Sequence, residues 1–352
     1  MKTITKRLAA TLLVSTFSLA AHAVGINFDG GEVAGCDDGT GFTPKDNHDN
    51  NNVYHCDRAA GSFANDIYIA SGFTVQMNFG QNPLNAASAI LGADGHLIGN
   101  LVSASTVAMG AGATINGNVT SGTTVALGVE AVVTGSSANT ATDNTITAGS
   151  TLALGANATV NGNVYATTTI AVGAEGSVNG NVDAGTTVAL GADSGVTGDV
   201  DAGTTVALGA NSSVTGYVNA GTTVALGADS HVVGNVESVT STVTLGVNSY
   251  VTGTTKALIA GVTLGAGAYA CETVEAVTAT LGAGSFVRGD LLATTMTVAA
   301  GSFVTEGMYG TTATLGANAC YGKEVVVTTL TQGAGAGQCR PTIPAFSCPL
   351  EI

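Results

Sequence analysis

Apolar and polar positions along this chain follow a pattern that returns about every 18 residues. In one copy, Ala202–Asn219, the apolar residues Val206 and Leu208 stand two positions apart. Thr205 and Ala207 alternate with them, as in a β-strand with one buried face. Gly, Val and Thr are weak helix formers, and the apolar spacing has no 3.6-residue period. The pattern therefore predicts an all-β protein.

Each repeat also divides into three short sides. Val214 and Val218 mark two further strands in the same copy. Gly209, Gly216 and Gly221 stand at the points where the chain has to turn. A unit this short cannot bury its own apolar face, so successive units must stack. We therefore expect a triangular β-helix, a solenoid in which each repeat forms one rung.

One glycine in each repeat, which follows Leu, Met or Val, marks the rungs. Its position recurs thirteen times within residues 85–332, at Gly92, Gly110, Gly128, Gly155, Gly173, Gly191, Gly209, Gly227, Gly246, Gly265, Gly282, Ala299 and Gly316. Most steps are 17 to 19 residues, and the single step of 27 contains a nine-residue insertion, Ser136–Asn144. A hexapeptide parsing would suit a left-handed helix, but the later steps of 19 and 17 break it, so we favour a right-handed one.

Aligning the rungs on this glycine reveals two outward columns of small residues. Four residues before the glycine, eleven of the thirteen rungs carry Thr, at Thr106, Thr124, Thr151, Thr169, Thr187, Thr205, Thr223, Thr242, Thr278, Thr295 and Thr312. Two residues before it, Ala gives way to Thr, through Ala108, Ala126, Ala153, Ala171, Ala189, Ala207, Ala225, Thr244, Thr263, Thr280, Thr297 and Thr314. Other outward positions drift from rung to rung, which indicates a constraint on this face in particular.

Two interpretations of the Thr columns stay open. Thr suits any exposed strand, because it is β-branched and its hydroxyl can bond laterally along the stack. Alternatively, a flat and uncharged array of hydroxyls and methyls can order water in a lattice. Rung spacing would fix one repeat of that lattice, and two residues of strand, roughly 6.6 Å, would fix the other. The second interpretation also accounts for the companion column, which starts with Ile90 and accepts only small or methyl-bearing side chains.

The first 23 residues have the form of a secretory signal peptide. Lys2, Lys6 and Arg7 precede an apolar run, which ends in a small-x-small cleavage site. The run is shorter than the ~20 residues that a membrane anchor needs. After cleavage, 24 acidic residues face only six basic ones, for a net charge of −18. This balance argues against nucleic acid and anionic membranes as partners.

The two ends differ from the repeats in between, and all six cysteines lie in the ends or in late rungs. Residues 24–84 and 333–352 are expected to cap the solenoid, since an uncovered rung invites edge-to-edge growth. In an exported chain, disulfides are the expected state of Cys36, Cys56, Cys271, Cys320, Cys339 and Cys348. Cys36 and Cys56 bracket one loop and are expected to pair. The other four cysteines allow three pairings.

Catalytic chemistry is weakly represented. The acids of the repeat are scattered over its turns, whereas glycan-cleaving β-helices cluster them with Arg, Lys or calcium. His96 and His231 occupy equivalent outward sites and are interpreted as solvated surface residues. The Asp- and Asn-rich loop between Cys36 and Cys56 offers ligands for calcium, but lacks the spacing of known calcium motifs, so a solvated loop is favoured. We expect no enzyme activity, catalytic residue, metal or cofactor.

The stretch Ala279–Val304 resembles the β-helical part of secreted microbial ice-binding proteins, in which such rungs present a flat Thr- and Ala-rich face to ice. The pairs Thr278/Thr280 and Thr295/Thr297 also match the Thr-x-Thr arrangement of several ice-binding solenoids. The resemblance implies ice, or a similarly ordered surface, as the partner of the two columns.

The regular middle, Ala184–Val236, resembles bactofilins as well, bacterial proteins that polymerise end to end through a small β-helix. That resemblance implies a structural, adhesive or self-assembling solenoid without ice activity. From the sequence we therefore expect a secreted ice-binding protein, with an extracellular structural solenoid as the alternative.

Overall fold

The computed structural model describes residues 26–30, 36–37, 52–56, 66–77, 83–135 and 144–338. The expected signal peptide, residues 38–51 of the Asp- and Asn-rich loop, residues 136–143 of the insertion and the tail from Cys339 lie outside these ranges. Every regular element of the described residues is a β-strand, and the strands stack in parallel into about 15 turns. The predicted β-solenoid is confirmed. The chain divides into two compact units, Met1–Val182 and Asp183–Ile352.

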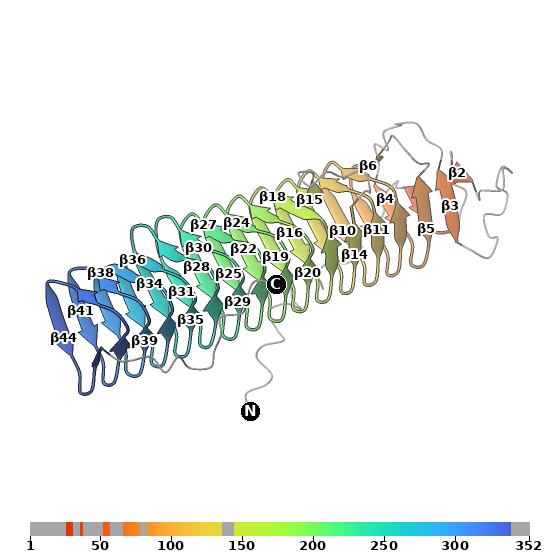
Figure 1. Ribbon diagram of the computed structural model, residues 1–352. Coiled ribbons are helices and arrows are strands. Elements are labelled where there is room, and N and C mark those ends of the chain that lie inside the picture. The colour runs from red at the N-terminus through yellow and green to blue at the C-terminus, as the bar shows by residue number, and fades with distance from the viewer. Residues whose placement is uncertain are drawn as a thin grey trace, which may run out of the picture. The chain divides into compact units, whose positions relative to one another are not determined.

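The strands of the first unit form three faces, called here the ladder face, the second face and the third face, and most turns contribute one strand to each (Figure 1). The ladder face contains β1 (Ile26–Phe28), β4 (Ile67–Ile69), β7 (Ala89–Leu91), β10 (Thr106–Met109), β13 (Thr124–Leu127), β16 (Thr151–Leu154) and β19 (Thr169–Val172). The second face contains β2 (Cys36–Asp37), β3 (Val53–Cys56), β5 (Thr74–Met77), β8 (His96–Ile98), β11 (Thr114–Asn116), β14 (Val132–Thr134), β17 (Thr159–Asn161) and β20 (Ser177–Val178). The third face contains β6 (Leu84–Ala86), β9 (Leu101–Ser103), β12 (Val119–Ser121), β15 (Asn144–Ala148) and β18 (Asn163–Ala166), and β21 (Val182–Ala184) begins at the last residue of the unit.

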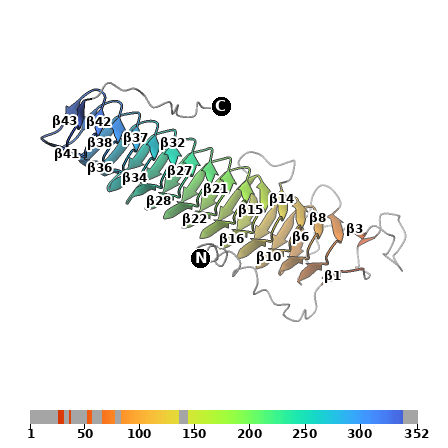
Figure 2. The same ribbon diagram turned by 90° about the horizontal axis from the view of Figure 1, so that it is seen from below.

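The second unit has the same three faces, and Figure 2 shows its ladder strands in succession from β22 to β41. The ladder face contains β22 (Thr187–Leu190), β25 (Thr205–Leu208), β28 (Thr223–Leu226), β31 (Val243–Leu245), β34 (Gly261–Leu264), β41 (Thr312–Leu315) and β44 (Thr329–Gln332). The second face contains β23 (Gly195–Val196), β26 (Ser213–Val214), β29 (His231–Val232), β32 (Tyr250–Val251), β35 (Tyr269–Ala270), β37 (Phe286–Val287), β39 (Phe303–Val304), β42 (Cys320–Tyr321) and β45 (Gly337–Gln338). The third face contains β24 (Val200–Ala202), β27 (Val218–Ala220), β30 (Val236–Ser238), β33 (Thr255–Ala257), β40 (Met308–Tyr309) and β43 (Val325–Val326), while β36 (Val274–Leu281) and β38 (Leu291–Val298) each run from the third face into the ladder face.

The core consists of the inward residues of all three faces. In the rung that begins with β25, Val206, Leu208, Val214 and Val218 are buried, as the alternation predicts. The ladder strand ends at a two-residue turn whose second residue, Asn211, has a φ of 58°. Asn, Asp and Gly tolerate this left-handed conformation best, which explains their recurrence at the turn. The buried hydroxyl of Ser212 then donates a 2.8 Å hydrogen bond to the carbonyl of Gly209 and closes the turn.

Backbone pairing confirms the repeat unit. Thr187 pairs with Thr205 and Thr205 with Thr223, so one 18-residue step moves the chain by one rung. In the first unit Thr124 pairs with Thr151, which confirms that the 27-residue step is a single rung with an insertion.

The solenoid has about 15 turns instead of the predicted thirteen, because one turn precedes the aligned repeats and one follows them. The early turn contains β4 and β5, which pair in parallel with β7 and β8. Solenoid pairing therefore starts within the segment that was expected to be a cap. The late turn contains β44 and β45.

A disulfide closes the loop at the start of the chain. Cys36 and Cys56 are bonded, as predicted, and they face each other where β2 and β3 pair antiparallel. β3 in turn pairs in parallel with β5, so the disulfide lies on the first strands of the second face. The hairpin therefore attaches the loop directly to the solenoid.

Candidate functional site

In the first unit the ladder face presents the predicted columns of Thr and Ala. Thr106, Thr124, Thr151 and Thr169 are consecutive partners in the parallel sheet. The alanines two residues further along each strand pair in the same way, from Ala108 to Ala171. All of these side chains are half-buried and lie between buried Val, Ile, Leu or Met neighbours. Parallel pairing thus fixes a grid of about 4.8 Å between rungs and about 6.6 Å along each strand.

In the second unit the same two columns change composition along the stack. The first three rungs hold Thr187, Thr205 and Thr223 with an Ala companion in each. From β31 onward the companion is Thr, in the register Thr244, Thr263, Thr280, Thr297 and Thr314. Thr242 precedes β31 directly, and Gly261 interrupts the first column at β34. The later rungs therefore present Thr-x-Thr strands whose side chains are mostly exposed.

The structure adds one rung to the columns. Thr329 pairs with Thr312 and Thr331 with Thr314, and both added side chains are exposed. The sequence carried a signal for this rung, since Gly333 follows Gly316 by 17 residues, the step of the preceding rungs. The prediction missed it because Gln332 replaces the apolar residue that normally precedes the glycine.

Hydroxyls of the columns differ from those of the neighbouring threonines in their hydrogen bonding. Thr204 donates to the Thr186 carbonyl and Thr222 to the Thr204 carbonyl, each at 2.7 Å. In the columns, by contrast, Thr151 is the single described member with a side-chain hydrogen bond, a 3.4 Å contact with Ser150. The column threonines of the described rungs therefore do not bond laterally to one another. Their hydroxyls are available to an external partner.

Charged groups of the second unit lie on its third face and at its turns, away from the columns. Asp183 is on β21 and Asp201 is on β24, and the pKa of Asp183 is raised by burial and by the Asp201 charge. The pKa of Tyr217 is raised first by the neighbouring Asp201, then by burial and by Asp199. Among the described residues, the ladder-face part of each strand is uncharged, since Glu275 of β36 lies in the third-face part of that strand, beside Lys256. The ladder face is therefore neutral beside an acidic flank.

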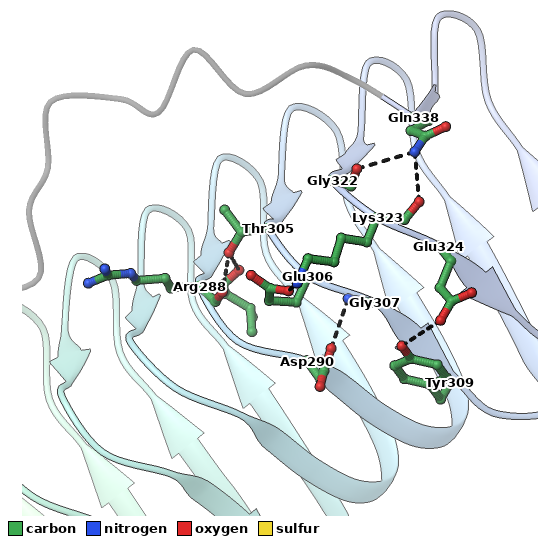
Figure 3. A network of polar contacts seen from close by, with 11 residues as sticks. Arg288, Asp290, Thr305, Glu306, Gly307, Tyr309, Gly322, Lys323, Glu324 and Gln338 are labelled. Carbon is green, nitrogen blue, oxygen red and sulfur yellow. Dashed lines mark hydrogen bonds and ion pairs between the residues drawn. The ribbon is translucent and has the colours of Figure 1, made fainter.

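A second group of charges ties together the turns between the second and third faces near the end of the unit (Figure 3). Lys323 forms an ion pair with Glu306, and Tyr309 donates a 2.9 Å hydrogen bond to Glu324. The Asp290 carboxylate accepts a 2.8 Å hydrogen bond from the Gly307 amide of the next rung. These contacts join successive rungs, which indicates a structural role.

Histidines of the second face are less solvated than expected. His96 and His231 are both half-buried, and Nδ1 of His96 contacts the Thr114 hydroxyl of the next rung. The His231 ring stacks on Tyr250 with a centroid distance of 4.9 Å. Burial lowers the pKa of His231. Both side chains are part of stacks between rungs and are not free surface groups.

Among the described residues, no three His, Cys, Asp or Glu side chains are grouped closely enough to hold a metal ion. The same residues include no helix long and apolar enough to span a membrane. Comparisons with family models, curated proteins and solved structures found no match.

Proposed function

We propose that this chain is a secreted, non-enzymatic ice-binding protein that acts through the ladder face. The observation that supports the proposal is the pair of uncharged columns, which keep one register from Thr187 to Thr331 in the second unit. The threonine hydroxyls of these two columns make no hydrogen bond within the described residues. An ordered surface is the partner that a repeating and neutral array fits best.

The mechanism rests on many weak contacts made together. Parallel pairing fixes the backbone under each column, so little conformational freedom is lost when the face meets a surface. Each Thr offers a hydroxyl that can bond to water and a methyl that restricts how neighbouring water orients. Water ordered by the columns would then join the ice lattice. The exposed Thr-x-Thr rungs, such as that of Thr295 and Thr297, would present these groups at two positions of each strand.

Export is part of the same proposal. A cleaved signal at residues 1–23 would deliver the chain to an oxidising compartment, and the Cys36–Cys56 disulfide is compatible with that destination. Whether the destination is the periplasm or the medium does not alter the role of the columns.

Ice-recrystallisation inhibition tests this function. We expect the purified protein to keep ice grains small at micromolar concentration. A triple variant on the columns, Thr187→Tyr, Thr205→Tyr and Thr223→Tyr, should abolish the effect while circular dichroism stays unchanged. Unrestrained grain growth with the unaltered protein would overturn the proposal.

One observation favours the alternative of an extracellular, polymer-forming solenoid. Leu330 of β44 pairs in register with buried Ala313, yet it is 41% exposed. Among the described residues, the register of β44 is with β41 alone. An open apolar rung of this kind can accept a strand from a second copy. Filaments in electron micrographs, which lengthen with concentration and disappear in Leu330→Lys, would support this alternative.

A further inference from the structure

We propose that the third face of the second unit binds a neutral saccharide in a hollow of about 310 Å³. The hollow is lined by Tyr217, Val218, Asn219, Asn235, Glu237 and Val239. Small-molecule sites occupy about 300–1,000 Å³, so the hollow suits one small ligand or a short stretch of a longer chain. The inference is independent of ice binding, because the Thr columns lie on the ladder face.

Two neighbouring rungs build the hollow. Their third-face strands are β27, which directly follows Tyr217, and β30, which directly follows Asn235. Asn219 of β27 pairs in register with Glu237 of β30, and the two strands are neighbours in Figure 1. The Val218 amide donates a 2.9 Å hydrogen bond to the Asn235 carbonyl, which aligns the residues that precede the two strands. Parallel pairing thus places an aromatic ring, two amides and a carboxylate on one small patch of a sheet.

Tyr217 stands in a column where its neighbours use their side chains to join rungs. One rung earlier, Asp199 accepts a 3.0 Å hydrogen bond from the Tyr217 amide. One rung later, Asn235 accepts a 2.9 Å hydrogen bond from the Thr254 amide. The Tyr217 side chain carries no carbonyl oxygen and cannot repeat this contact, and it is 45% exposed. The needs of the turn therefore do not account for an aromatic ring at this position.

The Tyr217 ring is held at its hydroxyl end. The hydroxyl is hydrogen-bonded to the carboxylate of Asp201 on β24, and the Asp201 charge is the main reason that the pKa of Tyr217 is raised. A ring that is already held loses little conformational freedom when a ligand binds. The negative face of an aromatic ring attracts C–H groups, such as those on the apolar face of a sugar ring. Tyr217 is therefore suited to be a stacking platform.

Asn219 supplies a second observation that points to a ligand. Its side-chain oxygen is buried and has no hydrogen-bond partner among the described residues. Buried acceptors without a donor cost free energy and are rare in folded proteins. No hydrogen bond fixes this amide, so it can turn about its Cβ–Cγ bond and present its oxygen or its nitrogen to a molecule in the hollow. A ligand with hydroxyl groups can bond to either atom.

The charge of the lining favours an uncharged ligand with many hydroxyl donors. Glu237 is half-buried, and Lys256, its register partner in the next rung, forms a 3.0 Å ion pair with Glu275. A carboxylate only accepts hydrogen bonds, and sugar hydroxyls can donate them. Asp201, in register with Asn219 on the other side, adds a negative charge that disfavours anionic ligands. A neutral saccharide combines hydroxyl donors with an apolar ring face.

Saturation-transfer NMR of the full chain tests the proposal with four neutral trisaccharides: cellotriose, maltotriose, mannotriose and N-acetylchitotriose. We expect at least one of them to receive magnetisation from the protein, equally at low and at high salt, because an uncharged ligand is not affected by screening. Absence of transfer to all four trisaccharides would overturn the proposal. Transfer to tetramethylammonium alone, lost at high salt, would show a cation site and would also overturn it.

Variants of two third-face tyrosines assign the binding to the hollow. Tyr217→Ala removes the platform and should weaken binding about tenfold in an NMR titration. Tyr217→Phe keeps the ring and should retain most of the affinity. The matched control, Tyr309→Ala, removes a tyrosine whose hydroxyl donates to Glu324 outside the hollow, and should leave the affinity unchanged. Equal losses in both Ala variants would contradict a site in the hollow.

Asn219→Leu separates binding from folding. This substitution keeps a similar size and removes a polar group without a partner, so the midpoint of thermal unfolding without saccharide should not fall. Affinity for the saccharide should fall several-fold, because the amide no longer bonds to the ligand. A lower midpoint with unchanged affinity would show that the Asn219 amide serves the fold, and would contradict its place in the site.

Discussion

The hydroxyl of Thr204 donates a 2.7 Å hydrogen bond to the backbone carbonyl of Thr186, one rung earlier in the stack. The next residue, Thr205, belongs to the ladder column, and its hydroxyl makes no hydrogen bond among the described residues. Two adjacent threonines thus have different tasks. The hydroxyl of Thr204 joins two rungs, and that of Thr205, on our proposal, binds a partner outside the chain.

This difference predicts opposite effects on stability. Thr204→Val removes a bond between rungs and should lower the free energy of unfolding by about 1 kcal/mol, the usual net value of one hydrogen bond. Thr205→Val keeps the β-branched shape and should change it by less than about 0.5 kcal/mol. Urea denaturation of the two variants measures both values. Equal losses would show that the column hydroxyls also hold the rungs together.

The turn that follows each ladder strand supplies a second prediction. Asn211 has a φ of 58°, which disfavours β-branched residues most. Asn211→Val should therefore destabilise the protein by about 1–3 kcal/mol, the usual cost of such backbone strain. Asn211→Gly, the matched control, adopts this conformation freely and should have little effect. The midpoint of thermal unfolding distinguishes them, and similar shifts in both variants would contradict the role assigned to the turn.

Much of this architecture could be predicted from the sequence, because a solenoid repeats one local rule. Alternation of Val206 and Leu208 with small residues identified the buried side of the ladder strand, and the spacing of the glycines identified the rungs. The last rung was not predicted because Gln332 stands where the other rungs have an apolar residue. A rung at the end of the stack is covered on one side only and needs fewer buried apolar residues. That Thr204 makes a hydrogen bond and Thr205 does not follows from side-chain geometry between rungs. A pattern of residue types does not specify this geometry.

Acid pH should lower the free energy of unfolding through His231 on the second face. Burial lowers the pKa of this ring in the folded chain, so the unfolded chain takes up the proton first as pH falls. The stabilising contribution of the neutral ring is complete above the unfolded pKa of about 6.5 and is lost as pH falls through the lower, folded value. His231→Phe keeps the stack on Tyr250 and should reduce the loss of stability between pH 7.5 and pH 5. Unfolding curves at both pH values test this, and an unchanged pH dependence in the variant would contradict it.

Extending the Thr-x-Thr pattern should raise ice activity. Ala189, Ala207 and Ala225 are half-buried companions in rungs where the first column is already Thr. Replacing all three by Thr extends the exposed array of the later rungs and, on our account, increases recrystallisation inhibition several-fold. The same substitutions to Ser add hydroxyls without methyls and serve as the control. A decrease in the Thr variant, with its fold intact, would indicate that the array does not set the activity.

Thermal hysteresis, the gap between the melting and freezing temperatures of a single ice crystal, tests the central claim most directly. Three proteins are compared: the unaltered chain, the ladder variant Thr187→Tyr/Thr205→Tyr/Thr223→Tyr, and a variant of the second face in the same three rungs, Gly195→Tyr/Ser213→Tyr/His231→Tyr. The control positions accept the larger ring, since His231 already stacks on Tyr250 and a Cβ at Gly195 lies 3.4 Å from its nearest neighbour. We expect a measurable gap for the unaltered chain and the second-face variant, and none for the ladder variant. A gap absent from the unaltered chain, or reduced equally in both variants, would contradict ice binding through the Thr columns.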